Sequence, residues 1–331
     1  MKKIILLVIV LFRTSFLVAQ NPNVGTSGAQ FLQIPVGAKA EGMAGAVVGL
    51  IDDASSVFWN PAGLVEVKSF DAHFTYTNWM KLFDFNAASV AYNVGEVGVF
   101  AANMIVFTTG KMEITTEEEP NGTGRFFDAQ DLALGISYAR YLTDRFSVGI
   151  TAKYVYQRIW NETADGIAFD IGTQYRLDFQ NLTIAMSMSN FGSDLRYDGP
   201  DLDVTVQQDE NYPISRLTPG RLKTDAYPLP LNFQVGIGFD VFQADFVKMK
   251  AAIDAVHPND NSEKLHFGTE FSFFDRLYLR GGYKYNYDDE DLTFGAGANI
   301  LFGNTAIWFN YAYTLFDILP GVHRVSVNLE F

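Results

Sequence analysis

The residue types that most often perform catalysis or bind metals are scarce in this sequence and stand far apart. The chain has no cysteine, and its four histidines lie on separate segments: His73, His257, His266 and His323. No H-E-x-x-H or similar spacing surrounds any of them. A Ser–His pair held by a third group is the other common arrangement, and no motif nominates one. The sequence therefore predicts no catalytic residue, no metal site and no cofactor.

The charged side chains give information about binding partners but indicate no catalytic site. The formal net charge of −14 argues against nucleic acid, which binds to basic patches. The acidic runs 117–119 and 288–291 admit two interpretations, a divalent-cation site or solvated loop tips, and their spacing matches no EF-hand. In the same way, His266 beside Glu270 indicates either a satisfied polar interior or a site.

The start of the chain has the order of a secretory signal peptide. Lys2 and Lys3 precede a short apolar run over 4–12, and Ala19 follows before the chain turns polar. The run is too short to span a bilayer as a helix. We therefore predict a signal peptide at 1–20; the alternative is a buried N-terminal helix.

From Asp71 onward, apolar and polar residues alternate in segments long enough for the ~9–11 residues of a tilted membrane strand. Ile150 and Tyr154, for example, share one face of a segment whose other face carries Gly149 and Thr151. We count about fourteen such segments, an even number as in single-chain bacterial barrels. The predicted bounds are 70–79, 84–94, 97–108, 129–142, 145–159, 165–177, 181–190, 231–242, 246–256, 263–274, 276–287, 291–302, 305–315 and 321–331.

The connections between these segments alternate in length. Even-numbered segments end in short links such as 95–96 and 303–304, whereas the longest polar loops, 109–128 and 191–230, follow odd-numbered ones. Short periplasmic turns opposite long extracellular loops are typical of outer-membrane barrels. We therefore predict an all-β, antiparallel transmembrane β-barrel in the cell outer membrane, in contact with membrane lipids and lipopolysaccharide, with both termini in the periplasm. A soluble β-sandwich is the alternative.

The inward faces of the predicted strands carry charges of both signs. These residues are Lys153, Lys248, Lys250, Asp254, Arg280, Lys284 and Arg324. Inside a barrel such charges most simply pair with one another and with a plug; a polar substrate path is the alternative. Because Gly149 also faces this polar interior, Gly149→Ser is expected to be milder than a lipid-face Ile150→Arg.

The last residues of the chain alternate as well, and the chain ends on an aromatic. The apolar positions are Val325, Val327, Leu329 and Phe331. This pattern resembles the C-terminal strand signal by which the barrel assembly machinery recognises its clients; the alternative is an edge strand that ends the chain. A terminal phenylalanine on the lipid face also suits an interfacial aromatic girdle.

Residues 21–69 do not alternate and are rich in glycine and alanine. The spacing of Gly42, Gly45 and Gly49 permits close packing of backbone against backbone. A barrel of about fourteen strands is too wide for wall side chains alone to fill. We therefore predict that 21–69 is a plug, or hatch, inside a barrel formed by 70–331; the 191–230 loop is the alternative closure.

Two short helical turns are predicted within this plug. Asn60 is a good N-cap, and it precedes Pro61 at the first helical position. Asp52 or Asp53 is placed to cap another short turn over 54–57. The plug is thus expected to consist of short turns rather than of long helices.

The stretch 37–64 resembles the N-terminal hatch of PorV/PorQ-type proteins, which belong to the wider superfamily of the long-chain fatty-acid transporter FadL. The residues that carry the resemblance are Gly37, Gly42, Gly45, Asp52, Asp53, Asn60, Pro61, Ala62 and Gly63. The rest of the chain resembles the family in layout, and a signal peptide ending in Ala-Gln is similar to those of Bacteroidetes.

The resemblance implies two different functions. PorV and PorQ serve the type IX secretion system and handle cargo proteins bound for the cell surface, whereas FadL-like members pass hydrophobic small molecules through a hatched barrel. The leading interpretation is a non-enzymatic outer-membrane protein of the PorV/PorQ type, with secretion components or cargo proteins as partners. Uptake of hydrophobic ligands by a FadL-like channel comes second, and an outer-membrane enzyme third.

Overall fold

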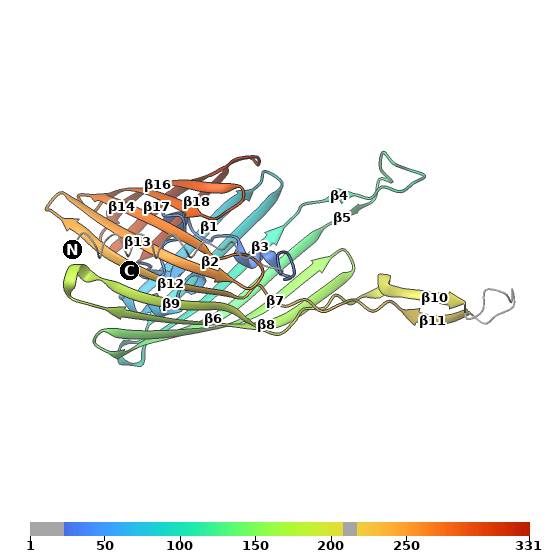
Figure 1. The fold of residues 1–331 in the computed structure, drawn as a ribbon, viewed down its shortest axis with the longest axis horizontal. Coiled ribbons are helices and arrows are strands. Elements are labelled where there is room, and N and C mark those ends of the chain that lie inside the picture. Colours follow the sequence, from blue (N-terminus) through green and yellow to red (C-terminus); the bar gives the residue numbers. More distant parts are fainter. Residues whose placement is uncertain (1–22, 208–216) are drawn as a thin grey trace, which may run out of the picture.

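The computed structural model describes residues 23–207 and 217–331, so the signal peptide predicted at 1–20 lies outside the described residues. The main feature is a closed antiparallel barrel of 14 strands, which confirms the predicted fold class (Figure 1). The barrel strands are β1 Phe70–Trp79, β2 Phe83–Asn93, β3 Val99–Thr108, β6 Ala129–Thr143, β7 Phe146–Ile159, β8 Glu162–Arg176, β9 Thr183–Gly192, β12 Asn232–Gln243, β13 Val247–Pro258, β14 Lys264–Phe273, β15 Leu277–Tyr285, β16 Glu290–Phe302, β17 Thr305–Phe316 and β18 Val322–Glu330. Pairing of β1 with β18 closes the wall.

The strand bounds lie close to the predicted ones. The largest difference is at β8, which begins at Glu162 instead of at Asp165. Trp160 takes a left-handed conformation with a φ of 53°, so the turn after β7 is tight. Strand pairing therefore includes Ile159 opposite Glu162, although the alternation of apolar and polar residues in β8 begins only at residue 165.

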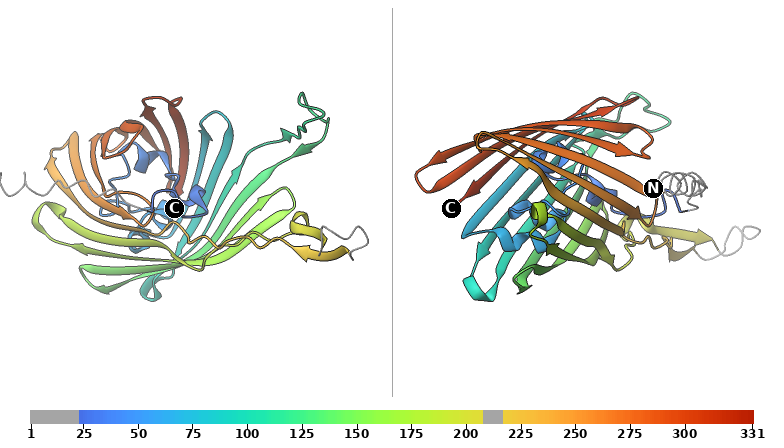
Figure 2. Two further views of the ribbon diagram at one scale, coloured as in Figure 1. Left: turned by 45° about the vertical axis from the view of Figure 1, so that its right-hand side comes forward. Right: turned by 60° about the vertical axis from the view of Figure 1, so that its left-hand side comes forward.

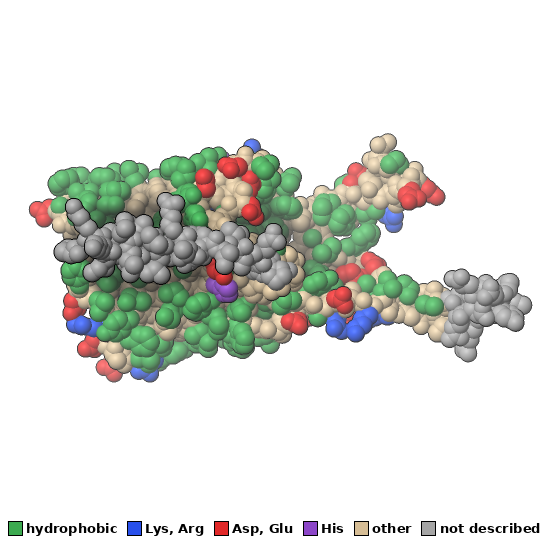
Figure 3. Space-filling model, in the orientation of Figure 1, with side chains coloured by type: hydrophobic (Ala, Val, Ile, Leu, Met, Phe, Trp, Pro, Cys, Tyr) green, Lys and Arg blue, Asp and Glu red, His purple; other side chains and the backbone are tan. Residues whose placement is uncertain are grey.

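The two faces of each strand differ as the alternation predicts. In β7, Ser147 and Thr151 are buried in the lumen, whereas Ile150 and Tyr154 are 46% and 43% exposed on the outer wall. Figure 3 shows hydrophobic side chains along this wall, with most charged side chains at the ends and on the projections. In a barrel that spans a membrane, such an apolar band faces lipid.

The two ends of the barrel carry different connections. Short links follow β2, β6, β8, β12, β14 and β16 at one end. At the other end, two pairs of strands project beyond the wall (Figures 1 and 2): β4 Met112–Glu113 with β5 Phe126–Phe127, and β10 Asp203–Gln207 with β11 Leu217–Arg221. The sequence predicted long polar loops at these positions, and both loops form strands of their own outside the wall.

Residues 23–69, called the N-terminal segment below, lie inside the barrel (Figure 2). They contain short helical turns: η1 Gln30–Gln33, α2 Ala38–Glu41, η2 Ala54–Phe58 and η3 Pro61–Glu66. In the described part of the chain, no helix has the length and apolar character that crossing a membrane requires. The N-terminal segment is instead held by its contacts with the inner wall.

The described chain begins and ends at opposite ends of the barrel. The amide of Phe331 donates to the Phe70 carbonyl (2.9 Å) at the end with the short links. The amide of Gly28 donates to Pro228 (2.9 Å) at the base of the longer hairpin. The N-terminal segment therefore runs along the lumen before it enters β1; the N-terminus itself lies outside the described residues, so the predicted position of both termini on one side stays a prediction.

Ile150→Arg places a charge in the apolar band of the outer wall and is expected to destabilise the folded barrel by about 2–4 kcal/mol. Leu142→Arg is the matched control, because Leu142 lies at the end of β6, where a charge reaches the interface at a cost of ~0–1 kcal/mol. Heat-modifiable gel mobility, after refolding into vesicles at intermediate urea, measures the folded fraction. Equal folded fractions in the two variants would contradict the assignment of the outer face.

Candidate functional site

Two wall glycines form a cradle for the start of η3. A side chain on Gly172 would overlap the Asn60 carboxamide, and one on Gly149 would overlap the backbone between Pro61 and Ala62. The wall and the N-terminal segment thus approach at backbone distance, which only glycine allows. The polar face of Gly149 is filled by the N-terminal segment, so the reason for expecting Gly149→Ser to be milder than Ile150→Arg does not hold, and the comparison between the two variants stays a prediction.

A second cradle lies across the lumen on β14, β15 and β16. A Cβ atom added to Gly282 would lie 2.5 Å from the Ala44 nitrogen, and one added to Gly295 would lie 2.9 Å from the Gly42 Cα. Gly268 has the same relation to the Met43 carbonyl, at 2.6 Å. The turn that follows α2 is therefore seated directly against the wall.

Asn60 links the N-terminal segment to the wall, and both the oxygen and the nitrogen of its carboxamide form hydrogen bonds. Its Oδ1 accepts from the Ala62 amide (3.1 Å) and caps η3 as predicted. Its Nδ2 donates to the carbonyl of Val48 (3.0 Å) and to that of Thr173 in β8 (3.2 Å). The side chain is fully buried, so this one amide joins η3, the preceding loop and the barrel.

The predicted acidic pair also has a local role. Asp53 caps η2 by accepting from the Ser55 amide (2.9 Å), and it accepts from Lys39 (2.9 Å). Asp52 accepts from the same lysine (2.5 Å). Burial alone would lower the pKa of Lys39, but Asp52 and Asp53 outweigh it and hold that pKa above its usual range. The pair thus fastens α2 to η2.

The glycines of the predicted hatch have steric roles. Gly37 and Gly45 have φ values of 89° and 74°, a region that L side chains rarely adopt. A Cβ on Gly45 would lie 3.0 Å from the Trp59 ring, and a Cβ on Gly63 would overlap the Ile51 carbonyl. Gly45 and Gly63 therefore allow close packing within the N-terminal segment.

One charged residue at the centre of the lumen was missed by sequence reasoning. Glu41 is fully buried, and one of its oxygens lies 2.9 Å from Lys284 Nζ, 3.4 Å from Arg324 Nη1 and 2.8 Å from the Thr314 hydroxyl. Burial would raise the pKa of Glu41, but Lys284 and Arg324 outweigh burial and hold it below its usual range. The signal in the sequence is that Glu41 is the one acidic residue in the stretch 37–51.

Wall carboxylates accept from backbone amides of the N-terminal segment. Asp254 accepts from Val48 (3.0 Å), and Asp71 accepts from Ala54 (2.9 Å). The inward position of Asp254 was predicted, but its hydrogen bonds come from the Val48 amide and from Gln234 (2.9 Å) rather than from a cation. Asp71 thus satisfies the amide at the start of η2, which has no partner within the helix, and Asp254 satisfies an amide of the turn before it.

The other inward charges pair largely within the wall, as predicted. Lys153 lies 2.8 Å from Asp170, Arg280 2.6 Å from Glu270, and Lys248 2.8 Å from Asp275 at the rim. His266 Nε2 lies 2.8 Å from the Tyr287 hydroxyl, which supports a polar interior at this position. Within residues 23–207 and 217–331, no group of three or more His, Asp or Glu is placed to hold a metal.

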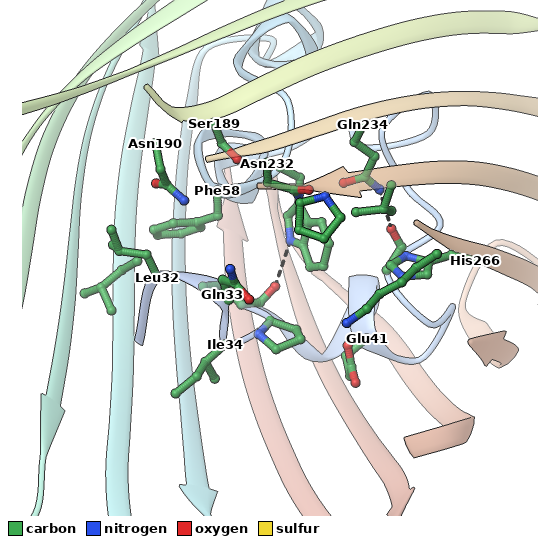
Figure 4. Close-up of a pocket in the computed structure, with 18 of the residues that line it drawn as sticks. Leu32, Gln33, Ile34, Glu41, Phe58, Ser189, Asn190, Asn232, Gln234 and His266 are labelled. Carbon is green, nitrogen blue, oxygen red and sulfur yellow. Dashed lines mark hydrogen bonds between the residues drawn. The ribbon is translucent and has the colours of Figure 1, made fainter. Parts of the chain in front are cut away.

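A cavity of about 130 Å³ remains between the N-terminal segment and the wall, toward the end with the hairpins. Figure 4 shows Leu32, Gln33 and Ile34 on one side of it and Asn190 and Asn232 on another. Its lining combines apolar groups with lysines and amides: Phe58, Ile105 and Val256 with Lys153, Lys264, Lys284 and Gln234. Such a lining does not form an apolar conduit.

Two further cavities, of about 270 and 220 Å³, lie toward the end with the short links, and Lys39, Asp52 and Trp308 line both. Met43 lines one of these cavities, whereas the adjoining Ala44 lines the cavity near the hairpins. The α2 region of the N-terminal segment therefore stands between an outer compartment and an inner one.

Gly172→Ala is expected to displace Asn60 and loosen the N-terminal segment, because the added methyl overlaps the carboxamide and disrupts a cap worth ~1 kcal/mol. Gly281→Ala is the control, since a Cβ there meets only Thr269 Oγ1 at 4.0 Å. In planar bilayers, single-channel openings should appear with Gly172→Ala, while Gly281→Ala stays as quiet as the parent at equal folded yield. If both variants are equally quiet, the N-terminal segment is not what closes the lumen.

Comparison with known proteins finds one matching family model and a group of solved structures with a similar fold. A family model described as "Type IX secretion system protein PorV" matches residues 17–199. No curated protein matches the chain. Among solved structures, the monoaromatic hydrocarbon channel CymD has a TM-score of 0.58 at 13% identity and covers 90% of this chain and 98% of its own.

Two other solved structures are similar to the same degree. The toluene transporter TbuX of Ralstonia pickettii has a TM-score of 0.55 at 15% identity, covering 89% of this chain and 97% of its own. A FadL homologue from Pseudomonas aeruginosa has a TM-score of 0.56 at 11% identity, covering 90% and 98%. At these identities the likeness shows a shared FadL-like barrel fold.

Proposed function

The chain belongs to the PorV family of type IX secretion system proteins, and on that basis we propose that it is an accessory or cargo-handling component of this system. It is an outer-membrane β-barrel protein of FadL-like fold, and these barrel families are generally non-enzymatic. Its partners in this proposal are secretion components and cargo proteins, together with the lipids and lipopolysaccharide around the barrel.

The observation that carries the proposal is the filled lumen. A barrel of about fourteen strands leaks unless something occupies it, and here the N-terminal segment is seated against wall glycines and capped by wall carboxylates. The proposed domains are a signal peptide at 1–20, a plug at 21–69 and the barrel at 70–331. A closed barrel with long projections suits a docking platform better than a conduit.

The proposed orientation follows from the same asymmetry. The short links and Phe331 are periplasmic, and the hairpins at 109–128 and 193–231 are extracellular, as in outer-membrane barrels generally. In this arrangement the start of the described chain lies at the outer end of the lumen. The apolar positions from Val325 to Phe331 then lie on β18, where the assembly machinery would recognise them.

Uptake of hydrophobic molecules is the second candidate. It is favoured by the fold shared with hydrocarbon and toluene channels and by Phe58 and Ile105 in the outer cavity. It is disfavoured by Lys153, Lys264 and Lys284 in the same lining, because a site for apolar ligands is lined mainly by apolar groups. A fold of this kind does not by itself decide the function.

Orientation is tested with single cysteines, because the chain has none of its own. Thr116→Cys and Thr205→Cys lie on the two hairpins and should react with an impermeant maleimide on whole cells. Asn304→Cys, between β16 and β17, should react only after the outer membrane is permeabilised. Labelling of residue 304 on intact cells, with silence at the other two, would invert the topology.

The function is tested by deleting the gene in a type IX-secreting host. Surface display of a type IX cargo should fall to background and return with the parent chain, because the system would lack a component. Uptake of radiolabelled toluene and of a long-chain fatty acid should not change. Normal cargo display together with lost uptake would instead establish the second candidate.

A further inference from the structure

The longer hairpin forms one unit with a defined base. Residues 193–207 and 217–231, called the external arm here, include β10 and β11. At the base, the Leu195 amide donates to Tyr227 (2.7 Å) and the Tyr227 amide donates to Leu195 (2.8 Å). This reciprocal pair joins the two legs of the arm where they meet the barrel. A displacement of the arm is therefore transmitted to both legs at this point.

The start of the N-terminal segment is bound to this base. The Gly28 amide donates to the Pro228 carbonyl (2.9 Å). Leu195 is buried, and it packs in one apolar cluster with Ala29 and Phe31 of the N-terminal segment. Both a backbone hydrogen bond and apolar packing thus connect the external arm to residues inside the lumen.

A single carboxylate beside the arm base holds the same turn: its neighbour Asn259 donates to the Leu231 carbonyl (2.9 Å) and to that of Leu229 (3.1 Å) in the arm. Asp260, on the connection between β13 and β14, accepts from the Ser27 hydroxyl, from Gln30 Nε2 (2.7 Å) and from Gln33 Nε2 (3.1 Å). Because three side chains of one short turn converge on this group, its removal frees the whole turn at once.

The turn continues directly into the lining of the outer cavity. Residues 32–36 line that cavity, so the stretch 27–36 touches the arm base at one end and the cavity at the other. Within the described residues, no hydrogen bond joins the β4–β5 hairpin to this stretch. The two hairpins therefore differ in their connection to the lumen.

We propose that residues 27–36 are a latch through which the external arm controls access to the outer cavity. A protein that binds the arm and shifts its base outward breaks the Gly28–Pro228 bond and withdraws Leu195 from Phe31. The latch then leaves the wall, and the cavity opens to the outside. This proposal rests on the proposed role of the N-terminal segment as a plug, and it adds that the plug is released from outside.

Hydrogen exchange of the intact protein in nanodiscs tests the coupling in both directions. Leu195→Ala removes the arm's apolar contact with the latch, and Asp260→Ala removes the carboxylate of the β13–β14 connection that holds it. If the latch couples them, each variant should raise exchange by at least about tenfold at the amides of Gly28, Leu32 and Ile34. Because coupling is reciprocal, Asp260→Ala should also raise exchange at Leu195 and Tyr227 in the arm base.

Matched controls separate coupling from general loosening. Asp288→Ala and Leu319→Ala alter an exposed carboxyl and an exposed leucine of other outer connections, and both should leave these amides at the parent rate. The Ile114 and Thr123 amides of the β4–β5 hairpin should stay protected in every variant. Faster exchange across the whole outer end, controls included, would overturn the latch.

A reversible lock provides the decisive comparison. An ideal Cβ at Gly28 lies 3.4 Å from the Tyr227 Cβ, close to the spacing of a disulfide. In the Asp260→Ala background, Gly28→Cys with Tyr227→Cys should restore slow exchange at Leu32 and Ile34 when oxidised and lose it when reduced. If Asp260→Ala frees these amides but leaves Leu195 and Tyr227 at the parent rate, the coupling is absent. Cargo display measures the proposed function separately.

Discussion

A strand edge left open in a bilayer would carry unpaired N–H and C=O groups in a medium that satisfies neither, so the wall of this barrel must close. Closure with 14 strands produces an interior that wall side chains do not fill. The N-terminal segment occupies this interior, and it comes close enough only because Gly149, Gly172, Gly282 and Gly295 carry no side chain. The position of the N-terminal segment, its caps and the separate cavities therefore depend on close backbone contact between the segment and the wall.

Backbone that fills a lumen must have its buried amides hydrogen-bonded, and short turns leave many amides without intrahelical partners. The wall supplies acceptors at those places, with Asp71 and Asp254 under Ala54 and Val48. The reverse arrangement appears at Glu41, which is an acid of the N-terminal segment held by cations of the wall. Removal of one partner leaves a buried charge unpaired, and this destabilises the fold far more than the intact pair stabilises it. Any other position of the N-terminal segment would separate these partners, so the pairs favour the observed position.

The sequence was sufficient to predict the barrel and the inward and outward faces of its strands. Alternation of apolar and polar residues and loop length depend on each strand and its neighbours along the chain. It also identified the Asn60 cap, since N-caps depend on adjacent residues. It did not show the surroundings of Gly149 and Glu41, which are made by residues more than eighty positions away. Alternation says that a side chain faces inward, but it does not say what lies across the lumen. The same limit explains why the course of the N-terminal segment toward the hairpin end was not predicted.

This chain shares its fold with hydrocarbon channels but belongs to a secretion family. Two regions of the barrel interior, an apolar patch of the wall and a cavity lined by lysines, show how both can be true. The inner wall near β2, β3 and β7 is apolar at Phe85, Ile105 and Val155, and Phe31 of the N-terminal segment covers it. A conduit for apolar molecules would leave such a surface open, whereas here the chain itself occupies it. The outer cavity is bordered by lysines, of which Lys153 and Lys284 pair with Asp170 and Glu41. The same barrel therefore has the interior space of a channel, but the N-terminal segment fills it, and the parts that extend beyond the barrel wall are the β4–β5 and β10–β11 hairpins.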